Sequence, residues 1–189
     1  WLVLNVSGEP TVINEESIIT ADLTHNSNGE DTSSGGHVPD NIPVNFTTTL
    51  GTITSTGYIK NGKAISTLNS KTATLGTANI TVTLDNQNVQ ISITIDKIVP
   101  TVNTGLTGGF YNTAQYVNLT ASDNLDSNPI IYYTLDGSTP TVSSEVYTGP
   151  ISIGTTTTLK FMAVDSAGNQ SPVTTEHYIF LTVGNLNTG

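Results

Sequence analysis

The chain has 189 residues, which is long for one small β domain and sufficient for two domains with separate cores. Only 35% of the residues are hydrophobic, and the absence of cysteine excludes both disulfides and thiolate metal sites. A net charge of −10, with only five Lys and Arg residues, argues against nucleic acid as a partner. It makes divalent cations more plausible ligands, and the alternative is that the acidic surface only keeps a secreted protein soluble.

Alternating apolar and polar residues dominate the first half and predict strands, because no helical period persists there. Turn sequences at Leu50, Asn61 and Asp85 separate the strands, and a polar Gly/Ser-rich stretch at residues 26–41 predicts a long loop. The last two strands form the clearest hairpin. The predicted strands are residues 2–6, 17–24, 42–48, 63–69, 78–85 and 89–96.

The second half follows the same pattern and contains more aromatic residues. Seven aromatic side chains fall between Phe110 and Phe161, whereas the first half has Trp1, Phe46 and Tyr58. This change predicts a second core with a different composition. The predicted strands are residues 116–122, 130–136, 146–153, 157–165 and 177–183.

Short strands separated by turns every eight to twelve residues or so are typical of a β-sandwich. We therefore predict an all-β chain of two tandem Ig-like β-sandwiches. Pro100 interrupts the strand pattern after Asp96, so the predicted domains are residues 1–97 and 98–183, followed by a linker at 184–189.

The first half resembles the invasin/intimin-type bacterial Ig-like domains. Asn28 and Gly29 match a loop of that family, and Pro43 to Phe46 match its P-V-x-F strand. The sequences NGKAISTLNS and GTANITVTLDNQNVQISITI agree with its later hairpins. The extended loop at residues 26–41 departs from the short connection that the family has at this place.

The second half resembles the chitobiase/β-hexosaminidase C-terminal-type Ig-like domain, through IYYTLDGSTPT, VYTGPISI and TTLKFMAVDSAGNQSP. Together, the two modules are similar to adhesin-like surface proteins of methanogenic archaea. The resemblance implies a secreted, repeated, non-catalytic module, since the chitobiase-type domain is an accessory domain without the catalytic barrel of the enzymes that carry it.

Two acidic loops of the second half, ASDNLDSNP and VDSAGNQSP, are the strongest candidate for a site. In a sandwich they fall at the pole where the domain begins, together with the linker that carries Asp96. Calcium takes about six to eight oxygen ligands, which such loops supply. The predicted ligands are Asp96, Asp123, Asp126, Asp165 and Asn169.

The alternative is that these side chains only bind the backbone of their own tight turns. The sequence is not that of an EF-hand, because it lacks the D-x-[DN]-x-[DN]-G pattern with a distal Glu. We also expect Glu15 and Glu16 in the first turn of the first domain at the end facing the junction.

Other polar motifs favour structural roles. Asp136 and Gly137 predict a primed hairpin turn rather than a catalytic acid. His25, His37 and His177 are too widely separated in sequence to suggest a zinc or nucleophile site. Lys160 alternates with Leu159 and Phe161, which predicts a solvent-facing side chain rather than a buried isopeptide donor.

Two further features concern glycans. Sequons occur at Asn5, Asn45, Asn79, Asn118 and Asn169, and the loop position of Asn169 makes it the preferred candidate for carrying a glycan. Tyr132 and Tyr133 point to opposite faces of a strand, and an outer row with Tyr116, Tyr147 and Tyr178 is the candidate for a carbohydrate platform, with core packing as the alternative.

These observations predict a non-catalytic, extracellular stalk or adhesion module of a cell-surface protein, with calcium as its candidate ion and no cofactor required. The expected partners are neighbouring Ig-like repeats of the same chain and a cell-surface protein or glycan. No apolar run reaches the roughly 20 residues that cross a bilayer, so this segment itself is not expected to insert into a membrane. The alternative function is a carbohydrate-binding accessory module, and a third possibility is a part of an enzyme whose catalytic domain lies elsewhere in the parent chain.

Overall fold

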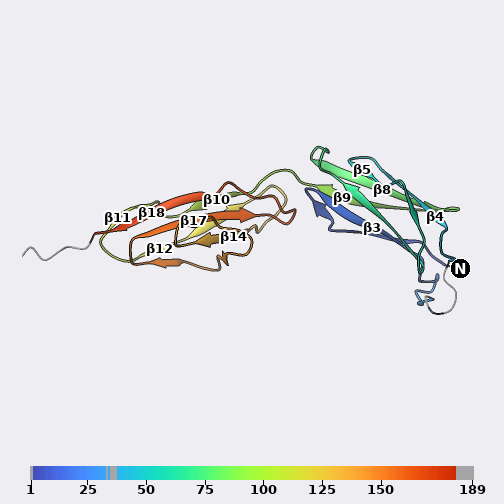
Figure 1. The fold of residues 1–189 in the computed structure, drawn as a ribbon, viewed down its shortest axis with the longest axis horizontal. Helices are drawn as coiled ribbons and strands as arrows, with labels where there is room; N and C mark the ends of the chain where they lie inside the picture. The colour runs from blue at the N-terminus through green and yellow to red at the C-terminus, as the bar shows by residue number, and fades with distance from the viewer. Residues whose placement is uncertain (1, 33, 35–37, 182–189) are drawn as a thin grey trace, which may run out of the picture. The chain divides into compact units, whose positions relative to one another are not determined.

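The computed structural model describes residues 2–32, 34 and 38–181, all in strands, turns and loops (Figure 1). Contacts between Cα atoms divide the chain into two compact units, Trp1–Lys97 and Ile98–Gly189. In the described part, no helix has the length and apolar character that crossing a membrane requires. The predicted linker at 184–189, His37 and Trp1 lie outside the described residues.

The first unit is a β-sandwich of two sheets. One sheet has the strand order β1 (Asn5–Glu9), β3 (Glu16–Asp22), β7 (Lys63–Asn69) and β5 (Thr52–Ile53). The other has the order β2 (Val12–Ile13), β9 (Gln87–Ile95), β8 (Gly76–Leu84), β4 (Pro43–Thr48) and β6 (Thr56–Tyr58). The alternation of buried and exposed residues along β7 and β8 directs their apolar side chains into the space between the sheets.

Among the described residues, Phe46 is the one aromatic side chain in the core of the first unit, and it packs with aliphatic side chains from both sheets. Ile19 and Leu68 come from one sheet, and Ile80 and Val82 from the other. Thr and Asn occupy many of the outward positions of β4 and β8, which suits strands whose second face meets water, whereas β3 and β7 expose Ile18 and Ile65 there.

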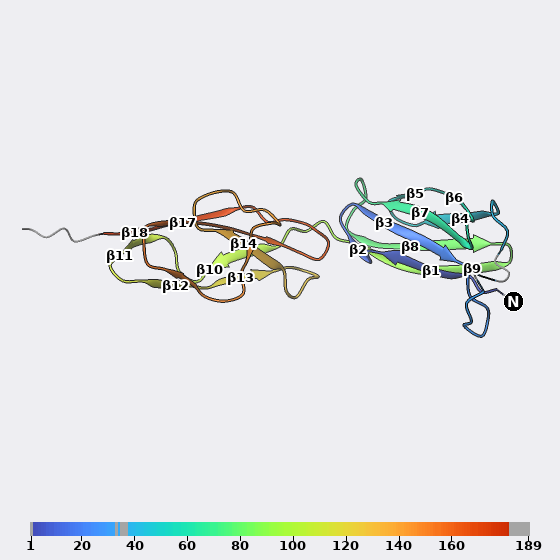
Figure 2. The same cartoon turned by 60° about the horizontal axis from the view of Figure 1, so that its bottom comes forward.

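The second unit is also a sandwich, with a five-stranded sheet and two short ladders (Figure 2). The large sheet has the order β11 (Gly109–Tyr111), β18 (Thr174–Phe180), β17 (Thr157–Val164), β14 (Ile130–Thr134) and β15 (Glu145–Val146). The short ladders pair β10 (Thr101–Thr104) with β13 (Leu119–Ser122), and β12 (Gln115–Val117) with β16 (Ile151–Ile153).

The core of the second unit is richer in aromatic residues than that of the first. Phe161 and Tyr178 are fully buried, and Tyr111 and Phe180 pack against the buried cluster. The Tyr111 and Tyr178 ring centroids lie 5.9 Å apart in a tilted arrangement, and the Tyr178 hydroxyl donates a hydrogen bond to the Leu106 carbonyl at 2.6 Å.

Most predicted strands occur, and β7 has the predicted ends, but two predictions were wrong about continuity. The single strand predicted at 116–122 is divided into β12 and β13, which join different partners. The single strand predicted at 146–153 is divided into β15 and β16, which lie in different sheets. Short strands β2, β5, β6, β10 and β11 were not predicted, because two to four residues carry too little periodicity.

Candidate functional site

The two acidic loops of the second unit lie at the same end of that sandwich. Thr101, the first residue of β10, is paired with Ser122, the last residue of β13. Ile130, the first residue of β14, is paired with Val164, the last residue of β17. The loops that follow β13 and β17 therefore both leave the sheets at the end where β10 begins, as can be followed in Figure 2.

The loop after β13 is folded around two carboxylates. Asp123 Oδ2 accepts hydrogen bonds from the N–H groups of Leu125 at 2.9 Å and Asp126 at 3.1 Å. Asp126 Oδ1 accepts one from the Asn128 N–H at 2.8 Å. Slight burial raises the pKa of Asp123, but hydrogen bonds from the amides of Leu125, Asp126 and Asn124 outweigh it and lower the pKa.

The loop after β17 is a tight turn held by Asp165. Its Oδ1 accepts a hydrogen bond from the Asn169 N–H at 2.8 Å, and its Oδ2 accepts one from Asn169 Nδ2 at 2.9 Å. Gly168 has a φ of 88°, a left-handed conformation that favours glycine, and its N–H donates to the Asp165 carbonyl at 3.1 Å.

A direct hydrogen bond joins the two loops. The Ser166 N–H donates to Asp126 Oδ2 at 2.8 Å, an interaction that the sequence analysis missed because no side-chain motif signals it. Carboxylate oxygens of Asp123 and Asp165 lie within 4.8 Å of each other. Each ionised carboxylate offers about four lone-pair positions, so both retain acceptor capacity beyond the turn hydrogen bonds.

Asp96 belongs to the first unit and follows β9. Its N–H donates to the Ile13 carbonyl at 2.8 Å, and the Lys97 ammonium donates to the Asn14 carbonyl. Ile13 is paired with Ile95 in the parallel β2–β9 ladder, so Glu15, which follows β2, lies at the same end of the first unit as Asp96. The Glu15 carbonyl accepts a hydrogen bond from the Ser70 N–H at 2.6 Å.

The structure corrects the choice of sequon. Asn169 is 8% exposed and its Nδ2 is bonded to Asp165, so the atom that would carry a glycan is buried and engaged. The four sequon asparagines at Asn5, Asn45, Asn79 and Asn118 are exposed. Asn45 in β4 and Asn79 in β8 are accessible because alternate side chains of these strands point outward, away from the core.

The predicted turn at Asp136 also differs in type. Gly137 has a φ of 81°, but Asp136 is not in the left-handed region, so this is not a primed hairpin turn. Asp136 Oδ1 instead accepts hydrogen bonds from the Ser138 N–H at 2.9 Å and the Ser138 hydroxyl at 2.6 Å. A primed turn is formed by Asn61 and Gly62, whose φ values are 52° and 77°.

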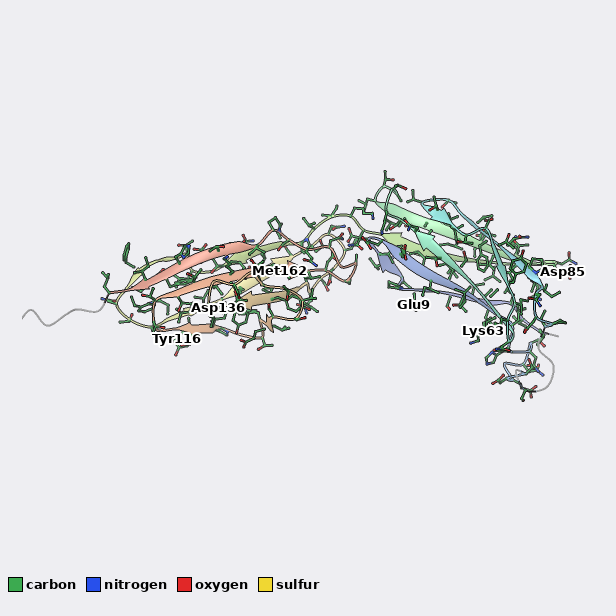
Figure 3. All side chains as sticks on the ribbon, in the orientation of Figure 1. Glu9, Lys63, Asp85, Tyr116, Asp136 and Met162 are labelled. Atoms are coloured by element: carbon green, nitrogen blue, oxygen red, sulfur yellow. The ribbon has the colours of Figure 1, made fainter. Side chains whose placement is uncertain are left out.

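Core packing, rather than a carbohydrate platform, accounts for most of the tyrosines considered in the sequence. Tyr178 is buried in the core, and Tyr133 and Tyr147 pack against it. Tyr116 remains exposed at 68% and points away from the second sandwich in Figure 3, and Phe110 is exposed at 70%. Lys160 lies between the fully buried Leu159 and Phe161, so it points outward as predicted.

Comparison with known proteins supports the fold. Residues 106–175 match the family model described as the chitobiase/beta-hexosaminidase C-terminal domain. No curated protein matches the chain. One solved structure that is similar to this chain is a C-terminal 282-residue fragment of intimin in complex with the intimin-binding domain of the translocated intimin receptor. It has a TM-score of 0.53 and 18% identity, with 95% of this chain covered.

The chain spans 64% of that intimin fragment. The fibronectin(III)-like modules of Clostridium thermocellum CbhA give a TM-score of 0.50 at 16% identity, over 95% of this chain and 94% of theirs. At these identities the likeness is one of fold, and it agrees with the Ig-like sandwiches predicted from the sequence.

Proposed function

We propose that this chain is a non-catalytic segment of an extracellular surface protein that serves as a stalk or adhesion module. The observation that carries the proposal is the pair of sandwich units with separate cores, built without cysteine and faced with uncharged polar residues. The adhesin-type fold of the intimin fragment supports it, as does the match of the second unit to an accessory domain of glycosidases.

An antibody raised against the purified chain tests the proposed location. We expect it to label intact cells of the source organism, and brief protease treatment of those cells should remove the signal. Labelling that requires permeabilised cells would overturn the proposal. An antibody against a cytoplasmic protein serves as the control for cell integrity.

A finer proposal is that calcium binds the acidic loops through Asp123, Asp126, Asp165 and Asn169. The approach of the Asp123 and Asp165 carboxylates and the link through Ser166 support it, because a cation needs oxygens that are already held together. Asn169 would contribute its side-chain oxygen, since Nδ2 already donates to Asp165.

Calorimetry with added calcium or EGTA tests whether calcium binds to the acidic loops. Calcium should raise the unfolding temperature of the second unit, and Asp123→Asn should abolish the shift. Asp85→Asn is the matched control, because Asp85 lies at the exposed tip of the β8–β9 hairpin in the first unit (Figure 3). Asp96→Asn tests separately the contribution predicted for Asp96. An unfolding temperature that is the same with calcium and EGTA would contradict the proposal.

A second candidate function is binding of a polysaccharide. It is favoured by the exposed aromatic side chains of Phe110 and Tyr116, since sugar rings stack on such surfaces. Sedimentation with insoluble chitin should then deplete the chain from solution in a saturable way. The variant Tyr116→Ala should weaken the depletion, whereas Tyr58→Ala, at an exposed tyrosine of the first unit, should not.

A further inference from the structure

One edge of the second sandwich contains an interrupted ladder. β12 and β13 follow each other with Asn118 between them, but β12 is paired with β16 and β13 is paired with β10. The β12–β16 register sets Gln115 opposite Ile153 and Val117 opposite Ile151. If β16 extended backwards in this register, it would run beside β13, and within the described residues it does not.

The segment before β16 does not run beside β13, because the chain crosses there from β15, which is paired with β14, to β16, which is paired with β12. The Tyr147 N–H donates to the Ile131 carbonyl at 2.9 Å, which places this residue beside β14. Pro150, directly before β16, has no N–H to give to a ladder. The Tyr147 hydroxyl lies 3.4 Å from Asn118 Oδ1 and so connects the two strand edges at one end of the gap.

Two residues of β13 turn their backbone groups toward this gap. The Gly105 N–H donates to the Asn118 carbonyl at 2.8 Å, so Asn118 faces the β10 side. Because successive residues of a strand direct their backbone groups to opposite edges, Leu119 and Ala121 face away from β10. Their N–H and C=O groups form a short edge that is not paired with a strand in the described part of the chain; Leu119 is 4% exposed and Ala121 is half-buried, so a partner reaches this edge only from within the adjoining groove.

A groove of about 400 Å³ lies along this edge. Its apolar lining comes from Leu119, Ala121, Pro129, Ile130, Val146 and Tyr147. None of the residues that line it is charged, although the chain carries fifteen Asp and Glu residues. Ile130 is 48% exposed and Val146 is 45% exposed, so the groove presents apolar surface to solvent.

We propose that this groove, which we name the β13 groove, binds an extended peptide segment of a partner protein as an added strand. The open backbone edge supplies hydrogen bonds to a strand, which no sugar or compact ligand would satisfy in the same way. The side chains of the bound peptide that face the groove should be uncharged, because the uncharged lining offers no partner for a buried charge. The acidic chain favours a basic residue beside the bound segment.

The peptide-bearing partner would be the protein to which the proposed adhesion module attaches, so the identity of the partner rests on the proposed function. The binding of a peptide to the groove does not. Its test uses the purified 189-residue chain, so binding can fail or succeed independently of where the protein is found on cells. The probe is a blocked octapeptide of alternating valine and threonine with one terminal lysine.

We expect the octapeptide to bind saturably, with amide shifts along β13 in NMR spectra of the labelled chain. Hydrogen exchange at the amides of Leu119 and Ala121 should slow by at least tenfold, because the peptide covers both N–H groups. A peptide of the same sequence, N-methylated at every second residue, should not bind because it cannot form the ladder. Equal binding of the methylated peptide would overturn the inference.

The variant Ala121→Pro removes one donor of the open edge and should weaken binding at least tenfold. It breaks no bond to β10, because the Ala121 N–H faces the groove. Ala121→Ser retains the N–H and should bind as the parent chain does. The N-methylated peptide decides the question if the proline variant does not fold.

Three results would contradict the inference. The first is the absence of any shift at millimolar peptide. The second is a set of shifts at another edge, such as β1 or β15, in place of β13. The third is a concentration-dependent dimer of the chain that protects Leu119 without peptide, which would make a second copy the occupant.

Discussion

Asp123 and Asp165 hold their loops by accepting hydrogen bonds from nearby backbone amides. These contacts are those of the turn alternative considered for the sequence, and they leave lone pairs for a cation. The burial of Asn169 shows how much a single side chain depends on its partner. In sequence it is a loop residue, whereas in the structure its amide completes the hydrogen bonding of Asp165.

The lowered pKa of Asp123 makes the second unit sensitive to acid. Its ordinary pKa is 3.8, and a lowered folded value contributes stability that is present above 3.8 and lost as pH falls through the folded value. Without added calcium, we therefore expect the unfolding temperature of the second unit to fall as the pH drops below 3.8. Calorimetry of Asp123→Asn should show a smaller fall, and an unchanged slope would contradict this.

Gly108 should not tolerate a side chain. A Cβ at this position would lie 2.6 Å from both the N and the O atoms of His177, and these are backbone atoms that cannot rotate away. Gly108→Ala should therefore lower the free energy of unfolding by about 1–3 kcal/mol. Gly149→Ala is the matched control, because no atom lies within 4 Å of its Cβ position. Urea unfolding measures both, and equal midpoints would contradict the expectation.

At the level of elements, the first strand of each unit is divided between two sheets. β1 is antiparallel to β3 while β2 is parallel to β9, and β10 is antiparallel to β13 while β11 is parallel to β18. The first strand of each unit thus contacts both its nearest neighbour and its last strand. This arrangement joins the two sheets at one edge and explains why short segments at the start of each unit escaped prediction.

The turn between Lys60 and Lys63 depends on its residue types. Both Asn61 and Gly62 have positive φ, and the N–H and C=O groups of Lys60 and Lys63 bond each other at 2.8 and 3.1 Å. Gly62→Ala should destabilise the first unit by about 1–2 kcal/mol, because a Cβ is unfavourable in the left-handed region. Asn61→Gly should change stability far less. Urea unfolding compares them, and similar losses would count against this explanation.

At the scale of the whole molecule, the two hydrophobic cores share no residue within the part of the chain that the structure describes. Leu68→Ala should lower the stability of the first unit by about 2–5 kcal/mol, and Phe161→Ala should lower that of the second by about 3–5 kcal/mol. In calorimetry, each variant should shift one transition and leave the other in place. A shift of both transitions by either variant would mean that the units do not unfold separately.

The sequence alone was sufficient for the features that depend on neighbouring residues. Alternation predicted β7, the β8–β9 hairpin and the outward position of Lys160, and the loop sequences identified Asp123 and Asp165 as neighbours at one end of a sandwich. Only the tertiary structure decided which sheet each half of a divided strand joins. It also decided that Tyr178 and Asn169 are buried and that β13 keeps an open edge. The physical reason is that periodicity is local, whereas strand pairing and burial depend on partners far along the chain.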